Sequence, residues 1–309
     1  MKLRARGNNV AISVPRRIAK VGALERASVR SNLFNSGVTV VLIIGAIGML
    51  FPIFFMMTTS LKTSGNVFIL PIRWIPGLEF VQQWANFPNA LNFMKWDVVY
   101  RNTVVIAVGN MLGDTLSALV VAYGFARFRA PGRQALFTIV LATLMIPYQV
   151  RLVPEYLGFA KLDLIDNTFL PIPLMLPAWF GSAFNIFLLR QFFMTIPIEM
   201  DEAAKIDGAG PFRVLTSILI PQIRPALAAV AIGSFTFNWS DFLRPLIYLN
   251  QPDHRTAAVA LSFFQAMYGA TPWNLLMAAA LVMVVPILLL FFFTQRYFIQ
   301  GVVVSGVKG

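Results

Sequence analysis

The segment Glu199-Met-Asp-Glu-Ala-Ala-Lys-Ile-Asp-Gly-Ala-Gly-Pro-Phe-Arg213 is a charged island between two long apolar stretches of this chain. Backbone inside a membrane must satisfy its own hydrogen bonds, and a polar segment that breaks at Gly208 and Gly210 does not suit that environment. We therefore expect a short helix that lies in water and offers a surface to another protein.

The rest of the chain has the composition of a multi-spanning membrane protein. Of its 309 residues, 58% are hydrophobic and 12% are charged, and the mean hydropathy is +0.71, whereas soluble domains are far more polar. The chain has no cysteine and a single histidine, His254, which leaves little for thiol, metal or acid–base chemistry. We predict a non-enzymatic protein that binds no metal. The net charge of +12 is spread over loops, so we predict no nucleic-acid partner.

Apolar stretches predict six transmembrane helices. At about twenty apolar residues per span, the candidates are roughly residues 37–60, 103–124, 134–155, 168–192, 225–249 and 273–296. Proline interrupts several of them, which a membrane tolerates where neighbouring helices satisfy the freed backbone groups. The predicted fold class is all-α: a polytopic membrane protein with a six-helix transmembrane bundle.

Basic residues predict the orientation of these helices. The segment before the first span holds eight Lys and Arg residues against one Glu, which favours the cytoplasm. Six spans return the C terminus to the same side, together with the link that carries Arg127, Arg129 and Arg133. We thus predict a basic, largely disordered cytoplasmic arm over residues 1–36 and a transmembrane domain over residues 37–309, with a cytoplasmic loop at about 195–223.

The charged island itself predicts a helix that begins after Pro197 and ends at Gly208. Its acidic first turn suits the positive end of a helix dipole, and Asp201 and Lys205 have the spacing of an i,i+4 ion pair. One stripe at the i, i+3, i+4, i+7 spacing would let a partner backbone approach closely through its alanines: Met200, Ala203, Ala204 and Asp207. A second short helix, at about 212–220, should follow.

These residues resemble a known family. Glu202-Ala203-Ala204, Asp207-Gly208-Ala209 and Ile220-Pro221 are similar to the cytoplasmic loop of the permease subunits of binding-protein-dependent ABC importers. Other segments resemble the carbohydrate-uptake, maltose-permease-like branch of that family: Asn102-Thr103, Trp239-Ser240-Asp241-Phe242, Pro245-Leu246, Arg255-Thr256, Leu276-Met277-Ala278-Ala279 and Gln295-Arg296-Tyr297-Phe298.

The resemblance implies a multi-pass subunit of a prokaryotic inner membrane, with both termini in the cytoplasm, that imports a sugar or oligosaccharide. Its implied partners are a second homologous permease, two ATP-binding subunits and an extracytoplasmic solute-binding protein. The chain has no G-x-x-x-x-G-K-[ST] phosphate loop, so ATP and magnesium would belong to the ATPase and this chain would bind no cofactor. The resemblance implies a coupling helix that contacts the ATPase through Glu199, Glu202, Ala203, Ala204, Asp207 and Gly208.

Polar residues within the predicted spans form a second group of candidates. An ionisable side chain in a membrane should face a partner or a watery cavity, and the sequence offers Asp114 with Asn110 and Asp241 with Asn238 and Arg244. Asn238 and Asp241 are candidates for a solute path. The alternative is that Asp241 and Arg244 form only a local ion pair.

Two other functions fit parts of the sequence. The chain could be a secondary transporter driven by ions through Asp114 or Asp241, although it lacks the paired broken helices with acidic residues typical of such proteins. It could also be a membrane scaffold whose charged loop anchors a soluble protein.

Overall fold

The computed structural model of this chain describes the backbone of residues 16–71, 73–74, 77, 80–166, 171–266 and 271–306, and side chains within residues 34–264 and 271–295 outside those gaps. This described part of the chain contains helices and turns but no strand, which confirms the predicted all-α class. The chain divides into two units, residues 1–55 and 56–309, and each is described by itself.

The first unit consists of most of helix α1 (Arg16–Ser60). Its apolar part, Phe34–Ser60, is long enough to cross a membrane and matches the first predicted span. The helix already begins at Arg16, so our expectation of a largely disordered arm was wrong for residues 16–36. The reason is local, since residues 16–36 hold three Ala and four Arg, which favour a helix, and no proline.

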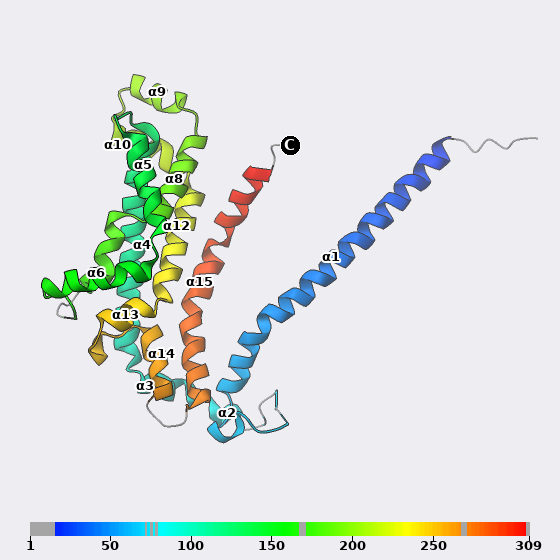
Figure 1. Cartoon of the computed structure of the whole chain (residues 1–309). Helices are drawn as coiled ribbons and strands as arrows, with labels where there is room; N and C mark the ends of the chain where they lie inside the picture. The colour runs from blue at the N-terminus through cyan, green and yellow to red at the C-terminus, as the bar shows by residue number, and fades with distance from the viewer. Residues whose placement is uncertain are drawn as a thin grey trace, which may run out of the picture. The chain divides into compact units, whose positions relative to one another are not determined.

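The second unit is a bundle of helices with shorter elements at its two ends (Figure 1). Its first elements are η1 (Ser64–Asn66), α2 (Phe80–Gln83), α3 (Asn86–Phe93), α4 (Trp96–Arg127), α5 (Arg133–Ala142), η2 (Thr143–Met145), α6 (Tyr148–Lys161), α7 (Ile172–Met175), η3 (Leu176–Phe180) and α8 (Ala183–Thr195). They are followed by α9 (Glu199–Ile206), α10 (Pro211–Arg213), the π-helix η4 (Val214–Leu219), α11 (Ile220–Gln222), α12 (Arg224–Trp239), α13 (Leu243–Tyr248), η5 (Pro252–His254), α14 (Ala257–Ala266) and α15 (Trp273–Gly306).

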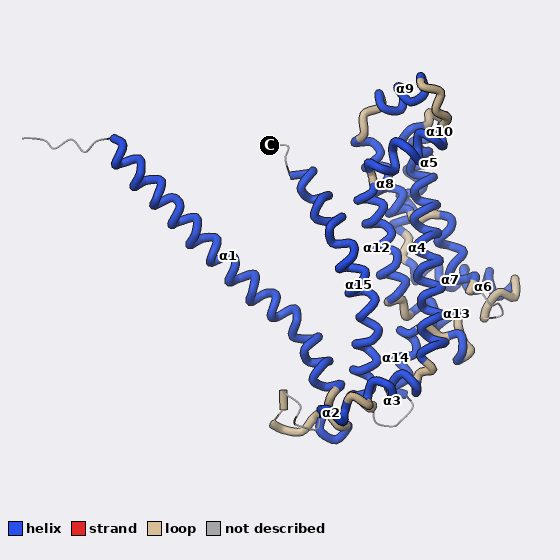
Figure 2. Tube along the Cα trace, turned by 180° about the vertical axis from the view of Figure 1, so that it is seen from behind, coloured by secondary structure: helices blue, strands red, loops and turns tan. Residues whose placement is uncertain are grey.

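Helix α4 is the central element of this bundle and packs against α8, η3 and α12, while α15 packs against α12 and α3. Helix α9 lies at one end of the bundle, and α3 and α14 lie at the other, as both views show (Figures 1 and 2). We call these the α9 end and the α14 end. Helices α4 and α15 both run from the α14 end towards the α9 end, so the C-terminal turns of both helices are directed towards the α9 end (Figure 1).

In the part of the chain that the structure describes, four helices are long and apolar enough to cross a membrane, and two bent pairs raise the number to six if each pair counts as one span. All six predicted spans therefore have a counterpart. The four single helices are Phe34–Ser60, Trp96–Arg127, Ile172–Thr195 and Trp273–Gln295. Part of the predicted span 168–192 lies outside the described residues.

Two predicted spans were wrong in shape. The span at 134–155 bends by 98° between Met145 and Tyr148, where Pro147 cannot continue the preceding helix, so α6 turns away from the axis of α5. The span at 225–249 stops at Trp239, and α13 continues as a separate short helix. Hydropathy alone does not detect such breaks, because the residues on both sides of each break are apolar.

Among the described side chains, the buried apolar ones form three clusters. The largest lies towards the α9 end and includes Phe193, Val214 and Leu219. A second lies towards the α14 end and includes Ala278 and Ala279, which have no exposed surface and let α15 pack closely. A third cluster surrounds Tyr248.

Gly113 lies where α4 packs tightly against Trp179 of η3. A Cβ at this position would lie 2.8 Å from the indole ring of Trp179, whereas a Cβ at Gly124, on the same helix, would meet nothing within 4 Å. We therefore expect Gly113→Leu to destabilise the protein by about 1–3 kcal/mol through overpacking, and Gly124→Leu to have little effect. Thermal unfolding of the detergent-solubilised protein measures this difference, and equal melting temperatures of the two variants would contradict the packing described.

Candidate functional site

Helix α9 ends in a Schellman motif, a hydrogen-bonded turn that reverses the chain after a helix. Gly208 has a φ of +79°, a left-handed conformation that favours glycine. Its N–H donates to Lys205 O (3.0 Å), and the N–H of Ala209 donates to Ala204 O (2.9 Å). The helix start and stop expected from the sequence are thus confirmed, and the turn at Gly208 sets the direction in which the chain leaves α9.

Of the predicted stripe on α9, Met200, Ala203 and Asp207 are exposed and Ala204 is buried. Glu199, Glu202, Ala203 and Ile206 are exposed and have the i, i+3, i+4, i+7 spacing of a single face. Ala204, in contrast, is 6% exposed and packs into the bundle's own core. Ala204 therefore contacts this chain, and its expected availability to a partner backbone was wrong. Asp207 and Gly208 are exposed beside the stripe.

Two apolar side chains extend this exposed face. Ile206, the last residue of α9, is 86% exposed, and Phe212 in α10 is 77% exposed. We call Glu199, Glu202, Ala203, Ile206 and Phe212 the α9 surface. Sequence reasoning missed the last two, although a bulky apolar residue on each side of the Gly208–Gly210 turn was the available signal. A surface that combines acidic and large apolar groups is typical of a protein contact site.

The opposite face of α9 is held by helix α4. The guanidinium of Arg127 lies 3.1 Å from the carboxylate of Asp201, and the side chains are only 8% and 2% exposed. Arg127 also donates a hydrogen bond to Ile196 O at the end of α8 (3.0 Å). One turn earlier on α4, the hydroxyl of Tyr123 donates to Pro211 O at the start of α10 (3.1 Å). Two side chains of α4 thus hold both ends of the loop and the helix between them.

This arrangement corrects the predicted ion pair of Asp201 with Lys205. Asp201 points into the bundle and pairs with Arg127, while Lys205 is exposed. Sequence reasoning used Arg127 only as a marker of membrane orientation. The partner was not predictable from spacing, because 74 positions separate the two residues in the sequence.

The second short helix expected after the turn is present, but its central part is a π-helix. Element η4 buries Val214, Leu215 and Leu219 in the core beneath α9. The chain then bends by 84° between the segment Pro211–Gln222 and α12. Short π-helical turns are frequent at functional sites, and this one lies between α9 and α12.

The polar residues predicted inside the spans form one hydrogen-bonded network. The amide of Asn110 on α4 donates to Asn238 Oδ1 on α12 (2.6 Å) and to Leu174 O on α7 (3.0 Å). The amide of Asn238 donates to Ser234 O (2.7 Å), and the hydroxyl of Ser234 donates to the carboxylate of Asp114 (2.7 Å). Asn110 and Asn238 are 0% and 5% exposed, so this network joins three helices inside the bundle.

The other candidates lie at the edge of the same network. Arg244 on α13 forms an ion pair with Asp241 and donates a further hydrogen bond to Asn238 Oδ1 (2.8 Å). The local Asp241–Arg244 pair expected from the sequence is therefore present. Asn238 uses its donors and its acceptor within the chain, whereas the Asp241–Arg244 pair is partly exposed, with side chains 11% and 19% accessible.

Towards the α14 end, Asp166 fastens the turn that follows α13. Its carboxylate accepts hydrogen bonds from the N–H groups of Asn250 (3.0 Å) and Gln251 (2.7 Å) and also contacts Nδ1 of His254. From the other side, the amide of Asn102 on α4 donates to the carbonyl oxygen of Asp253 (2.8 Å). The turn is thus tied to both the segment after α6 and the start of α4.

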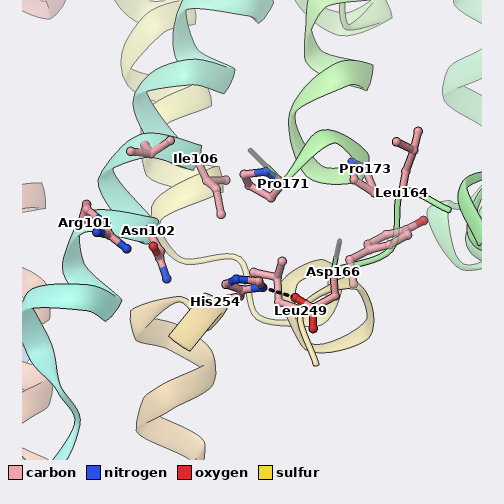
Figure 3. A pocket seen from close by; sticks show the side chains of 11 residues that line it. Arg101, Asn102, Ile106, Leu164, Asp166, Pro171, Pro173, Leu249 and His254 are labelled. Atoms are coloured by element: carbon pink, nitrogen blue, oxygen red, sulfur yellow. Dashed lines mark hydrogen bonds and ion pairs between the residues drawn. The ribbon is translucent and has the colours of Figure 1, made fainter. Parts of the chain in front are cut away.

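A pocket of about 130 Å³ opens between these segments (Figure 3). Its lining combines apolar and polar groups: Arg101, Asn102, Val105, Ile106, Leu164, Asp166, Pro171, Pro173, Tyr248, Leu249 and His254. None of these residues was predicted as a site residue, because they come from five separate segments that only the fold brings together.

A helical bundle with enough apolar helices for four to six spans and a short acidic helix at one end defines a polytopic membrane protein. Residues 104–304 match the model of the family described as the binding-protein-dependent transport system inner membrane component. The chain belongs to this family, and it is accordingly a transport permease subunit and an inner membrane component, as the sequence resemblance indicated.

Curated relatives support this assignment. The chain is 34% identical over 274 residues to the sn-glycerol-3-phosphate transport system permease protein UgpE of Pectobacterium atrosepticum. The aligned region covers 86% of this chain and 95% of the relative. The chain is 33% identical to the protein of the same name from Rhizobium meliloti, over 85% of this chain and 93% of the relative.

Solved structures support the fold. A chain of a bacterial ABC transporter involved in the import of the acidic polysaccharide alginate matches with a TM-score of 0.73 and 22% identity, covering 87% of this chain and 98% of that chain. A chain from the alginate transporter in complex with an alginate pentasaccharide-bound periplasmic protein matches with a TM-score of 0.62 and 16% identity, covering 88% of this chain and 95% of that chain.

The buried pair predicts how the loop responds to mutation. Arg127→Leu or Asp201→Leu alone leaves an unpaired buried charge, which costs about 3–5 kcal/mol, so the loop should leave its seat and trypsin should cleave it faster at Lys205 and Arg213. The double variant should be cleaved more slowly than either single variant, because both charges are removed. Arg129→Leu, at an exposed neighbouring position, is the control. Wild-type cleavage rates in both single variants would contradict the role given to the pair.

Proposed function

We propose that this chain is one of two permease subunits of an ATP-driven importer and that its α9 surface docks onto a partner ATPase. The observation that supports this most directly is the placement of helix α9. Its α9 surface is exposed, and Asp201 on its other side is paired with Arg127 of α4. A helix held this way transmits a push from a soluble subunit to the membrane helices as a rigid element.

The proposed coupling residues are Glu199, Glu202, Ala203, Ala204, Asp207 and Gly208, in two different roles. Glu199, Glu202, Ala203 and Asp207 are exposed and available for contact. Ala204 acts by seating the helix, since it packs into the core, and Gly208 acts by setting the turn. ATP and magnesium would bind to the ATPase. Among the described residues, no group of three or more His, Cys, Asp or Glu side chains is placed to hold a metal ion.

The proposed orientation places the α9 end in the cytoplasm. The link at Arg127–Arg133 lies at this end, as expected from the distribution of basic residues. An ATPase in the cytoplasm could then reach α9, and the α14 end would face an extracytoplasmic solute-binding protein. Both termini of the chain would be cytoplasmic, and the residues before the apolar part of α1 would form the basic arm proposed for residues 1–36.

The proposed cargo is a carbohydrate or a related polyol phosphate. The similarity to permeases named for sn-glycerol-3-phosphate transport covers most of both chains, and the fold neighbours come from a transporter named for an acidic polysaccharide. In the proposed path, Asp241 offers a partly exposed carboxylate at the edge of the polar network, while Asn238 holds α12 against α4.

The two alternative functions have less support. An ion-coupled transporter needs acids that are free to bind the ion, yet Asp114 is bound by Ser234 and Asp241 by Arg244. A scaffold would not need the buried polar network that links the helices. Reconstitution separates the three: uptake that requires ATP, the ATPase and the binding protein supports the importer alone.

Changes on the α9 surface should disconnect transport from ATP hydrolysis. Glu202→Lys reverses a charge and Ala203→Trp blocks close approach, so we expect the ATPase to detach or uptake to fall at least tenfold, which is a loss of about 1.4 kcal/mol in a rate-limiting coupling step. Membrane insertion should be unchanged. Glu155→Lys on α6 and Ala130→Trp in the α4–α5 link are the matched controls. Normal ATP-dependent uptake by both α9 variants would refute the docking proposal.

Asp241 and Asn238 should respond differently to substitution. Asn238→Ala leaves the buried amide of Asn110 short of an acceptor, which costs about 1–3 kcal/mol, so it should lower the melting temperature of the complex. Asp241→Asn keeps the size of the side chain and should instead change the KM of uptake. If Asp241→Asn leaves KM and the rate unchanged, Asp241 is not on the solute path.

A further inference from the structure

The pocket at the α14 end has an asymmetric distribution of charge. Asp166 is its acidic group, and this carboxylate is already occupied by two backbone N–H groups and by His254. Arg101, in contrast, has no carboxylate within ion-pair distance among the described residues. The charge that remains available to a ligand in this pocket is therefore positive.

The polar groups are placed around the opening of the pocket. Figure 3 shows Arg101 and Asn102 on one side, on α4, and His254 facing them from η5, with Pro171 across from α4. Nδ1 of His254 is engaged by Asp166, which leaves Nε2 as the ring nitrogen free to bind a ligand. The guanidinium of Arg101 suits an oxyanion, which accepts its hydrogen bonds, and the imidazolium form of His254 would present a second donor at Nε2.

The remaining lining suits the carbon skeleton of a small solute. Ile106, Leu164, Pro173 and the ring of Tyr248 form an apolar wall of this cavity of about 130 Å³. Apolar walls with a few converging polar groups are typical of small-molecule sites. The wall is also firmly held, because Tyr248 is 2% exposed and packs against Tyr156 and Phe159 of α6.

We propose that this pocket is an anion subsite of the permease that binds the phosphate or carboxylate of a polyol phosphate or acidic sugar, with Arg101 as the principal anion-binding residue. Its assignment to the cargo rests on the proposed function; its affinity for an oxyanion does not. Arg101 binds the charge, His254 adds a donor when its ring is protonated, and the Tyr248 face contacts the carbon skeleton.

The chain has no cysteine, so a single introduced thiol reports on the pocket without background from this subunit. In membranes that contain the full transporter, Val105→Cys in the pocket is labelled with methanethiosulfonate reagents that carry a negative or a positive charge. We expect the anionic reagent to react severalfold faster than the cationic one. Adding Arg101→Gln should abolish this preference, and adding Arg151→Gln, outside the pocket on α6, should not.

Protection by ligands identifies the occupant. Millimolar sn-glycerol 3-phosphate or glucuronate should slow the labelling of Val105→Cys severalfold, uncharged glycerol should not, and Arg101→Gln should remove the protection. Stronger protection by these compounds than by inorganic phosphate assigns the site to the cargo, whereas equal protection by inorganic phosphate overturns that assignment. Leu164→Cys, on the opposite wall, repeats the measurement if the first variant is poorly produced.

Labelling without a charge preference, or protection by glycerol as strong as by the anions, would overturn the anion subsite itself. Neither measurement requires transport or ATP hydrolysis. The subsite can therefore fail while the importer function stands, and it can be found even if uptake is not.

Discussion

The buried ion pair between Arg127 and Asp201 is the contact on which the position of the polar loop depends. A buried charge that loses its partner is costly, so this pair favours the position of α9 against the end of α4. Arg127 and Tyr123 also donate hydrogen bonds to Ile196 O before α9 and to Pro211 O after it, which hold both ends of the loop against α4. As a result, the face of α9 with Glu202 and Ala203 is presented to solvent on a helix that cannot turn freely.

Helix α4 connects this loop with the rest of the permease domain. Near its middle, Asn110 joins it to α7 and α12 through the buried polar network. At its start, Asn102 and Thr103 bind the segment that leads into α14, through Asp253 O and Ala257 N. In the proposed importer, a displacement of α9 would reach the polar network and the pocket at the α14 end through this one continuous helix.

The sequence predicted what local patterns determine. Apolar length located the spans, and Pro197, the acidic first turn and Gly208 located α9, because span length and helix ends are set by neighbouring residues. It did not predict the bends after Met145 and at Trp239, the inward face of Ala204, or the partner of Asp201. Those features depend on contacts between residues far apart in the chain, as does the pocket around Arg101, where no single segment carries a recognisable pattern.

The central claim, that α9 moves as one body with α4, is tested most directly by a distance measurement between two spin labels. The absence of native cysteine allows Lys205→Cys on α9 and Val120→Cys on α4, both exposed positions, to be labelled in the assembled transporter. We predict the same narrow distance distribution by pulsed electron paramagnetic resonance without nucleotide and with a trapped ATP analogue. A distance that shifts or broadens between these two states would show that α9 moves independently of α4 and would contradict the account.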